Sequence, residues 1–187
     1  MTLYLDGQSV GEGRVEHTQP MIFSADETAD LVVPEGGTNG VIVAQGGAFG
    51  GWAVYLHEGR PKYCYNLLGL RRFYAEADAP VPAGNHQVRM EFAYDGGGLA
   101  KGGDVTLYYD GNAVGTGRVE HTQPMIFSAD ETTDIGYESG TTVTPEYTAA
   151  TSRFTGKIHW VQIDLGKDDH DHFIDPEERL RIAMARQ

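Results

Sequence analysis

The sequence has little cysteine, few basic residues and no long apolar run. Its 187 residues include one cysteine, Cys64, which excludes an intrachain disulfide and a cysteine-based zinc cluster. No apolar run approaches the roughly 20 residues with which a helix crosses a bilayer. Residues 1–7 lack the basic and apolar regions of a signal peptide, so the sequence as written predicts a cytoplasmic protein.

Acidic residues outnumber basic ones, 27 to 14, and the formal net charge is −13. Such a surface repels phosphate, so neither nucleic acid nor an anionic membrane is an expected partner. The apolar fraction of 40% argues against disorder. With 25 glycines and 8 prolines, the composition indicates a turn-rich, all-β protein.

An internal repeat is the most unusual feature. At an offset of 104, residues 2–30 align with residues 106–134, and 24 of the 29 pairs are identical. The differences fall at positions 5, 8, 9, 12 and 29 of the first copy. Each copy contains an Asp-Gly turn signal, at residues 6–7 and 110–111, between two short β-type runs. The sequence therefore predicts two nearly identical hairpins.

Two such hairpins cannot fill the same place in one domain. A free hairpin is marginally stable in water and exposes unpaired edges, so we expect strand exchange or edge pairing between chains and a homo-oligomer. The alternative is that the first segment is a poorly packed remnant of recombination. The predicted domains are residues 1–30, a duplicated hairpin segment copied from 105–134, and residues 31–187, a β-sandwich.

Strand patterns run through the rest of the chain. Two segments show the period of two that is typical of β-strands. Trp52, Val54 and Leu56 alternate with Ala53, Tyr55 and His57, and the apolar residues of 88–94 alternate with Arg89, Glu91 and Ala93. Near the C-terminus, Asp175-Pro176-Glu177-Glu178 is typical of a helix start. Apolar spacing then predicts a short helix over 176–185 that packs on the sandwich.

Three segments have a distinctive sequence: PAGNHQVR at 82–89, VTLYYDG at 105–111 and FTGKIHWVQID at 154–164, the last followed by a helix start. Together they resemble concanavalin-like, laminin-G-like proteins. The resemblance implies an all-β, antiparallel β-sandwich with a short C-terminal helix. Residues 40–47, 49–52, 63–69 and 127–132 are, more narrowly, similar to the C-terminal domain of large bacterial arylsulfatases, and this match covers about residues 29–187.

The arylsulfatase resemblance implies an accessory module beside an enzyme. Sulfatases convert the cysteine or serine of a C/S-x-P-x-R motif to formylglycine. Cys64 is followed by Tyr65, Asn66 and Leu67, so it does not match, and the family's calcium ligands lie in the catalytic domain. No sulfatase catalytic residue is carried over, and a formylglycine sulfatase is not expected.

Several histidines are candidate metal ligands. His170 and His172, within the run DDHDH, have a spacing of two and point to the same side of an extended segment. His17 and His121, each preceded by glutamate, are duplicated by the repeat; hairpin exchange would bring them together, with His159 as a further candidate. Imidazole and carboxylate suit zinc, manganese or nickel. The competing interpretation is a solvated acidic connector and polar outer strand faces.

Acidic turns offer a second kind of metal site. Laminin-G-like folds often bind structural calcium in loops, and calcium prefers six to eight oxygen ligands. The competing interpretation is that these residues favour turn geometry. The acidic residues concerned are Asp26, Glu27, Asp30, Asp130, Glu131, Asp134 and Glu138.

The favoured function is non-catalytic: a self-associating accessory or binding module derived from an arylsulfatase C-terminal domain. One alternative is a small metal-dependent hydrolase of activated esters, in which an open metal position activates water. Another is a carbohydrate-binding module. The ligands we expect are a carbohydrate or a sulfated ester. Five aromatic residues are candidates to stack on sugar rings, with core packing as their competing role: Trp52, Tyr55, Tyr63, Tyr65 and Tyr74.

Overall fold

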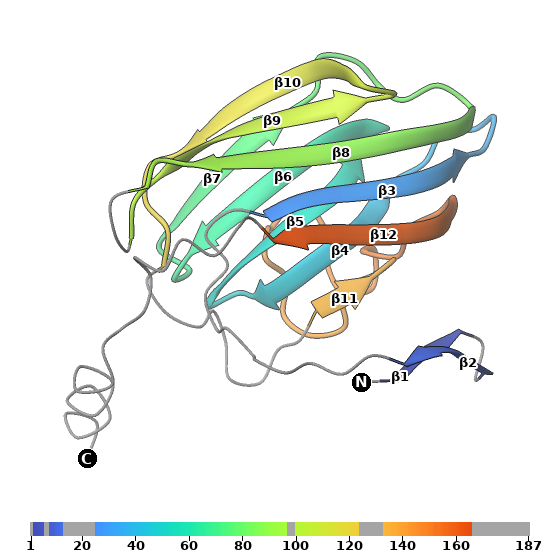
Figure 1. Cartoon of the computed structure of the whole chain (residues 1–187), viewed down its shortest axis with the longest axis horizontal. Helices are drawn as coiled ribbons and strands as arrows, with labels where there is room; N and C mark the ends of the chain where they lie inside the picture. The colour runs from blue at the N-terminus through green and yellow to red at the C-terminus, as the bar shows by residue number, and fades with distance from the viewer. Residues whose placement is uncertain (1, 6–7, 13–24, 97–99, 124–132, 166–187) are drawn as a thin grey trace.

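The computed structural model describes residues 2–5, 8–12, 25–96, 100–123 and 133–165 (Figure 1). All regular structure in these ranges is β, as predicted, and every pair of neighbouring strands is antiparallel. The predicted helix 176–185 lies outside the described residues. Nothing in the described part is a helix long and apolar enough to span a membrane.

Ten strands form one sheet that folds into two facing layers (Figure 1). The sheet order is β11-β4-β5-β6-β7-β10-β9-β8-β3-β12. We call one half the front layer; it contains β3 (Ala25–Val33), β8 (Gly84–Tyr94), β9 (Gly103–Tyr109), β10 (Asn112–Val119) and β12 (Lys157–Leu165). The back layer contains β4 (Gly40–Gly47), β5 (Gly50–His57), β6 (Arg60–Leu67), β7 (Arg71–Glu76) and the short β11 (Thr133–Ile135).

The main core lies between the two layers. The alternating residues of β8 point Val88, Met90 and Phe92 inward, and those of β5 point Trp52, Val54 and Leu56 toward them. The period-two pattern of the sequence is thereby confirmed for both strands. The layers join where β7 meets β10 through the single pair Gly117 and Ala75.

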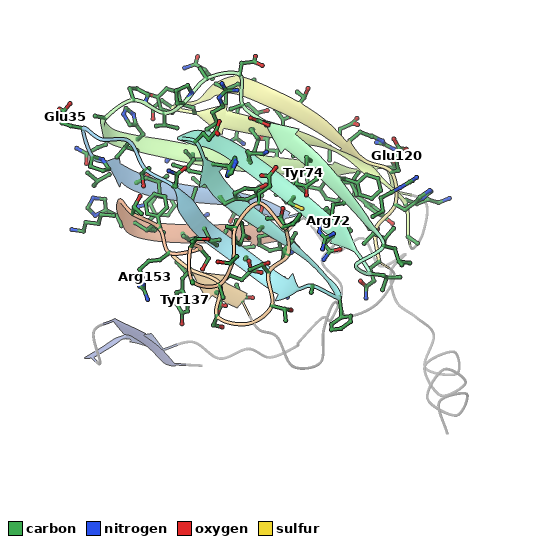
Figure 2. All side chains as sticks on the ribbon, turned by 180° about the vertical axis from the view of Figure 1, so that it is seen from behind. Glu35, Arg72, Tyr74, Glu120, Tyr137 and Arg153 are labelled. Carbon is green, nitrogen blue, oxygen red and sulfur yellow. The ribbon has the colours of Figure 1, made fainter. Side chains whose placement is uncertain are left out.

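A second, smaller core lies on the outer face of the back layer. The segment 136–156, which we call the covering segment, crosses this face (Figure 2). Its Val143 and Tyr147 pack against residues of β4, β5 and β6: Val41, Ala44, Ala53, Tyr55 and Cys64. The middle strands of the back layer are therefore buried on both faces.

The repeat takes two different structures. The second copy supplies β9 and β10, which lie in the large sheet between β7 and β8. The first copy supplies β1 (Thr2–Leu5) and β2 (Gln8–Glu12), which form a separate two-stranded sheet. β3 begins at Ala25 and pairs with both β8 and β12. The predicted boundary after residue 30 therefore falls inside a strand, and residues 25–30 belong to the sandwich.

Candidate binding site on the outer face of β7

Most of the aromatic residues proposed to stack on sugars are core residues. Tyr74 is the exception: 38% of it is exposed, whereas none of the other four exceeds 4%. Trp52, Tyr63 and Tyr65 lie in the main core, and Tyr55 lies under the covering segment. The stacking hypothesis is therefore wrong for these four residues and remains open for Tyr74.

Tyr74 stands between a cation and a carboxylate on one strand face. β7 points Phe73 and Ala75 into the main core, so its period of two places Arg72, Tyr74 and Glu76 on the outer face. Figure 2 shows Arg72 and Tyr74 as neighbours on this face. A guanidinium, a phenol ring and a carboxylate thus follow one another along about 14 Å of strand.

Arg72 is held in place by the covering segment. Its Nε donates a hydrogen bond of 2.8 Å to the backbone oxygen of Val143. A guanidinium has five N–H donors, so the two terminal nitrogens keep donors for an anion or a hydroxyl group. A side chain oriented in this way loses little conformational entropy when it binds a ligand.

The Tyr74 ring is fixed from two sides. Its hydroxyl lies 3.1 Å from Oγ1 of Thr144. Lys62 Nζ lies 5.5 Å from the ring centroid, within the range of a cation–π interaction. The ring is therefore held rigid while more than a third of the residue stays accessible.

A network of charges centred on the buried Lys62 supports this arrangement. Lys62 is only 6% exposed, and its Nζ donates to Oε1 of Glu146 at 2.6 Å and pairs with Oε2 of Glu76 at 3.2 Å. The Tyr55 hydroxyl donates to the other oxygen of Glu146 at 2.6 Å. Desolvation alone would raise the pKa of Glu146, but the hydrogen bonds from Lys62 and Tyr55 outweigh it and lower that pKa. Glu146 is therefore ionised at neutral pH.

Three of the four predicted metal ligands, His17, His170 and His172, lie outside the described residues. His121 is described and exposed, just after β10. Across the described ranges, no three histidine, cysteine, aspartate or glutamate side chains gather closely enough to hold a metal. The histidine and calcium hypotheses both stay predictions. Cys64 is buried, and desolvation raises the pKa of its thiol to about 12, as an inert structural cysteine requires.

Sequence reasoning missed most of this site. It assigned no strand to residues 71–76, although Arg72, Tyr74 and Glu76 alternate with Phe73 and Ala75 there. That alternation was the available signal for β7. Lys62 and Glu146 are 84 residues apart, and the covering segment has no periodic pattern, so no comparable signal pointed to their pairing.

The architecture is that of concanavalin-like, laminin-G-like β-sandwiches, as the sequence predicted. A similar solved structure is the carbohydrate-binding module CBM40 of the Ruminococcus gnavus IT-sialidase, bound to α2,3 sialyllactose. The TM-score is 0.53 at 14% identity, over 81% of this chain and 82% of that one. The same module bound to α2,6 sialyllactose gives a TM-score of 0.53 at 15% identity over the same shares of the two chains.

A second group of similar structures contains laminin G domains. Mouse laminin α1 domains LG4-5 give a TM-score of 0.53 at 16% identity, over 82% of this chain and 39% of that one. The LG1-3 region of the laminin α2 chain gives a TM-score of 0.53 at 12% identity, over 86% of this chain and 34% of that one. No protein family and no curated protein matches the sequence. At these identities the likeness establishes the fold alone.

Proposed function

We propose that the protein is a non-catalytic carbohydrate-binding module whose site is the outer face of β7. The observation that supports this most directly is the accessible and rigidly held ring of Tyr74, between the guanidinium of Arg72 and the carboxylate of Glu76. An aromatic ring offers a flat apolar surface to the C–H face of a sugar. The neighbouring charged groups are placed to hydrogen-bond with the hydroxyl groups of that sugar.

Arg72 favours an acidic glycan. A guanidinium binds a carboxylate or a sulfate through paired hydrogen bonds, and its terminal nitrogens are the donors that Val143 leaves unused. Sialyllactose, the ligand named for the CBM40 structures, is therefore the first glycan to test. Sulfated glycans come next, because a guanidinium binds sulfate as it binds carboxylate.

A glycan panel followed by titration calorimetry tests the proposal. We expect Tyr74→Ala to weaken binding at least tenfold, about 1.4 kcal/mol, and Arg72→Gln to weaken binding of acidic glycans more than that of neutral ones. Tyr137→Ala is the matched control, because Tyr137 is 41% exposed and lies 5.4 Å from the Arg153 guanidinium, away from β7 (Figure 2). Equal losses in the two tyrosine variants, or no binding by the unaltered protein, would refute the proposal.

The arylsulfatase origin and the self-association remain parts of this proposal. Separate motifs in residues 40–69 and 127–132 support the origin. Self-association is tested by light scattering of the purified protein, where a single-chain mass contradicts it. The hydrolase alternative also stays a prediction, and the metal content of the purified protein tests it.

A further inference from the structure

The two hairpins have the same internal pairing, residue for residue. In β1–β2 the pairs are 2 with 12, 3 with 11, 4 with 9 and 5 with 8. In β9–β10 they are 106 with 116, 107 with 115, 108 with 113 and 109 with 112. Each number in the second set exceeds its counterpart by 104, and both hairpins skip one valine, Val10 or Val114, at the same irregularity. β1–β2 therefore already has the register of β9–β10 over the four pairs next to the turn, and β9–β10 continues with three more pairs.

The position between β7 and β8 requires glycine at two places in its occupant. A Cβ atom on Gly115 would lie 2.2 Å from the backbone oxygen of Glu76, and one on Gly117 would lie 2.4 Å from that of Tyr74. These contacts are with backbone, which cannot move aside as a flexible side chain can. The first copy has glycine at the equivalent positions, 11 and 13. Glycine otherwise weakens strands, and the position between β7 and β8 supplies a reason for it at both places.

The occupant must also supply core residues. Leu107 and Val105 of β9 are buried between the layers, and their counterparts in the first copy are Leu3 and Met1. Two differences favour the second copy. The Tyr109 hydroxyl lies 3.0 Å from Nδ1 of His86, whereas the counterpart of Tyr109 is Leu5, and β9 begins with residues 103 and 104, which have no counterpart in the first copy. The first hairpin therefore matches the position in register, glycines and core leucine but lacks one hydrogen bond and the first residues of β9.

The same chain is able to deliver its first hairpin to this position. β10 ends and β3 begins at the same end of the front layer, three strand spacings apart, which is about 14 Å. In the docked form the counterpart of β10 ends at Val15, so nine residues, 16–24, connect it to β3, and a chain of that length spans up to about 30 Å. A hairpin tethered in this way has a high effective concentration at the site.

Exchange between chains has no comparable advantage. Every chain contributes two hairpins but only one position between β7 and β8. In any assembly of such chains, one hairpin per chain therefore stays outside that position, whichever chain supplies the other. Swapping therefore buries no additional apolar surface. This argument favours the hairpin of the same chain as the alternative occupant.

We propose that the position between β7 and β8 is a docking site for the β1–β2 hairpin of the same chain. Either hairpin completes the sheet, whose order reads β7-β10-β9-β8 with the second copy and β7-β2-β1-β8 with the first. The two forms differ in the side chains at which the copies differ and in the first residues of β9, which the first copy lacks. The protein thus carries two alternative occupants for one place in its core.

Blocking one copy at a time tests the redundancy. Gly115→Val prevents β10 from approaching β7, and Gly11→Val is the same change in the first copy. We expect thermal unfolding to be unchanged in Gly11→Val and its midpoint to fall by about 5 °C or less in Gly115→Val. The double variant should lose its cooperative transition. A Gly115→Val protein as damaged as the double variant, or a double variant that folds normally, would overturn the proposal.

Disulfide trapping shows which hairpin occupies the position. Tyr108 pairs with Arg89 across β9 and β8, so Tyr108→Cys with Arg89→Cys should cross-link within the chain and serves as the reference. In the Gly115→Val background, Tyr4→Cys with Arg89→Cys should give the same cross-link within one chain. A cross-linked dimer would show that the hairpin comes from a second copy of the chain. A folded protein without the cross-link would show that β1 does not occupy the position. Either result refutes the proposal.

Discussion

The two layers of the sandwich are built from similar strands but experience different surroundings. The front layer buries one face: along β8, residues of the inner face are buried, and residues of the outer face are accessible. The back layer buries two faces, and seven of the eight residues of β5 are buried. The covering segment makes this difference, because it turns a solvated sheet face into a second core. A strand's neighbours, more than its own composition, therefore decide how many of its residues are core.

The same comparison holds for charged residues. On the front layer, Arg89 pairs with Glu91, and both are about one-third exposed. On the back layer, Lys62 pairs with Glu146 while its own side chain is 7% exposed. Exposed ion pairs contribute little to stability because water and salt screen them. The pair under the covering segment is partly shielded from both, so its removal should have a larger effect.

The largest difference between the layers is expected for a matched pair of tyrosines. Tyr55 is fully buried, contacts Tyr147 edge-on at 5.2 Å and donates a hydrogen bond to Glu146. Tyr55→Ala should lower the free energy of unfolding by about 4 kcal/mol, through a cavity and a lost bond. Tyr108, on the outer face of the front layer, donates in the same way to Glu91, but Tyr108→Ala should change stability far less. Urea denaturation of both variants measures the difference, and equal losses would contradict it.

A smaller effect is expected when the back-layer charge network is broken. Lys62→Met keeps the length of the side chain but leaves Glu146 without its closest cation, so we expect a loss of about 2 kcal/mol. Arg118→Met is the more exposed control, because the Arg118 side chain is 38% exposed and pairs with Asp95 and Asp104. The Lys62 variant should keep its deficit in 1 M salt, because shielded pairs are screened less. A deficit that vanishes in salt would show that the pair behaves as an exposed one.

The sequence predicted the front layer better than the back layer. Alternation along residues 88–94 identified β8 and its inner face, and Asp110-Gly111 marked the turn of the β9–β10 hairpin, where both residues have positive φ. The aromatic residues of β5 and β6 were harder to interpret, because both faces of these strands are largely apolar and the sequence does not distinguish a second core face from an exposed, ligand-binding one. The site on β7 was out of reach for another reason: it depends on the covering segment, whose position follows from long-range packing.

Two glutamates, the buried Glu27 and the half-buried Glu146, should give opposite pH dependence. Glu27 points from β3 into the interior and is 3% exposed, and its Oε2 has no hydrogen-bond partner among the described residues. Desolvation, and then the charge of Asp26, raise the pKa of Glu27 well above its usual 4.5. The protonated Glu27 therefore contributes fully to stability below pH 4.5, the pKa of glutamate in the unfolded chain. This contribution is lost as the pH rises, because the unfolded chain releases the proton at a lower pH than the folded chain does. The depressed pKa of Glu146 acts in the other direction, and its contribution is lost as the pH falls.

Glu27→Gln separates the two contributions. The variant cannot ionise at position 27, so its stability should fall less than that of the unaltered protein between pH 4.5 and pH 7, by at most about 1.4 kcal/mol per pH unit. Glu146→Gln should instead reduce the loss of stability below pH 4.5. Urea denaturation at several pH values measures both. If Glu27→Gln leaves the pH profile unchanged, the carboxyl group of Glu27 is not desolvated in solution.

Thiol labelling compares the two layers without changing their stability. Cys64 lies on the covered face of β6, so its sulfur is inaccessible. Desolvation raises the pKa of its thiol to about 12, so almost no thiolate is present at pH 8. Ala93 lies exposed on the outer face of β8, so the thiol introduced by Ala93→Cys should react within minutes with Ellman's reagent, whereas Cys64 reacts only when the back layer opens. The slow rate then reports the opening of the covering segment, and Tyr147→Ala should raise it and leave the fast rate unchanged. If both thiols react at the same rate, the outer faces of the two layers are equally accessible, and the second core does not exist in solution.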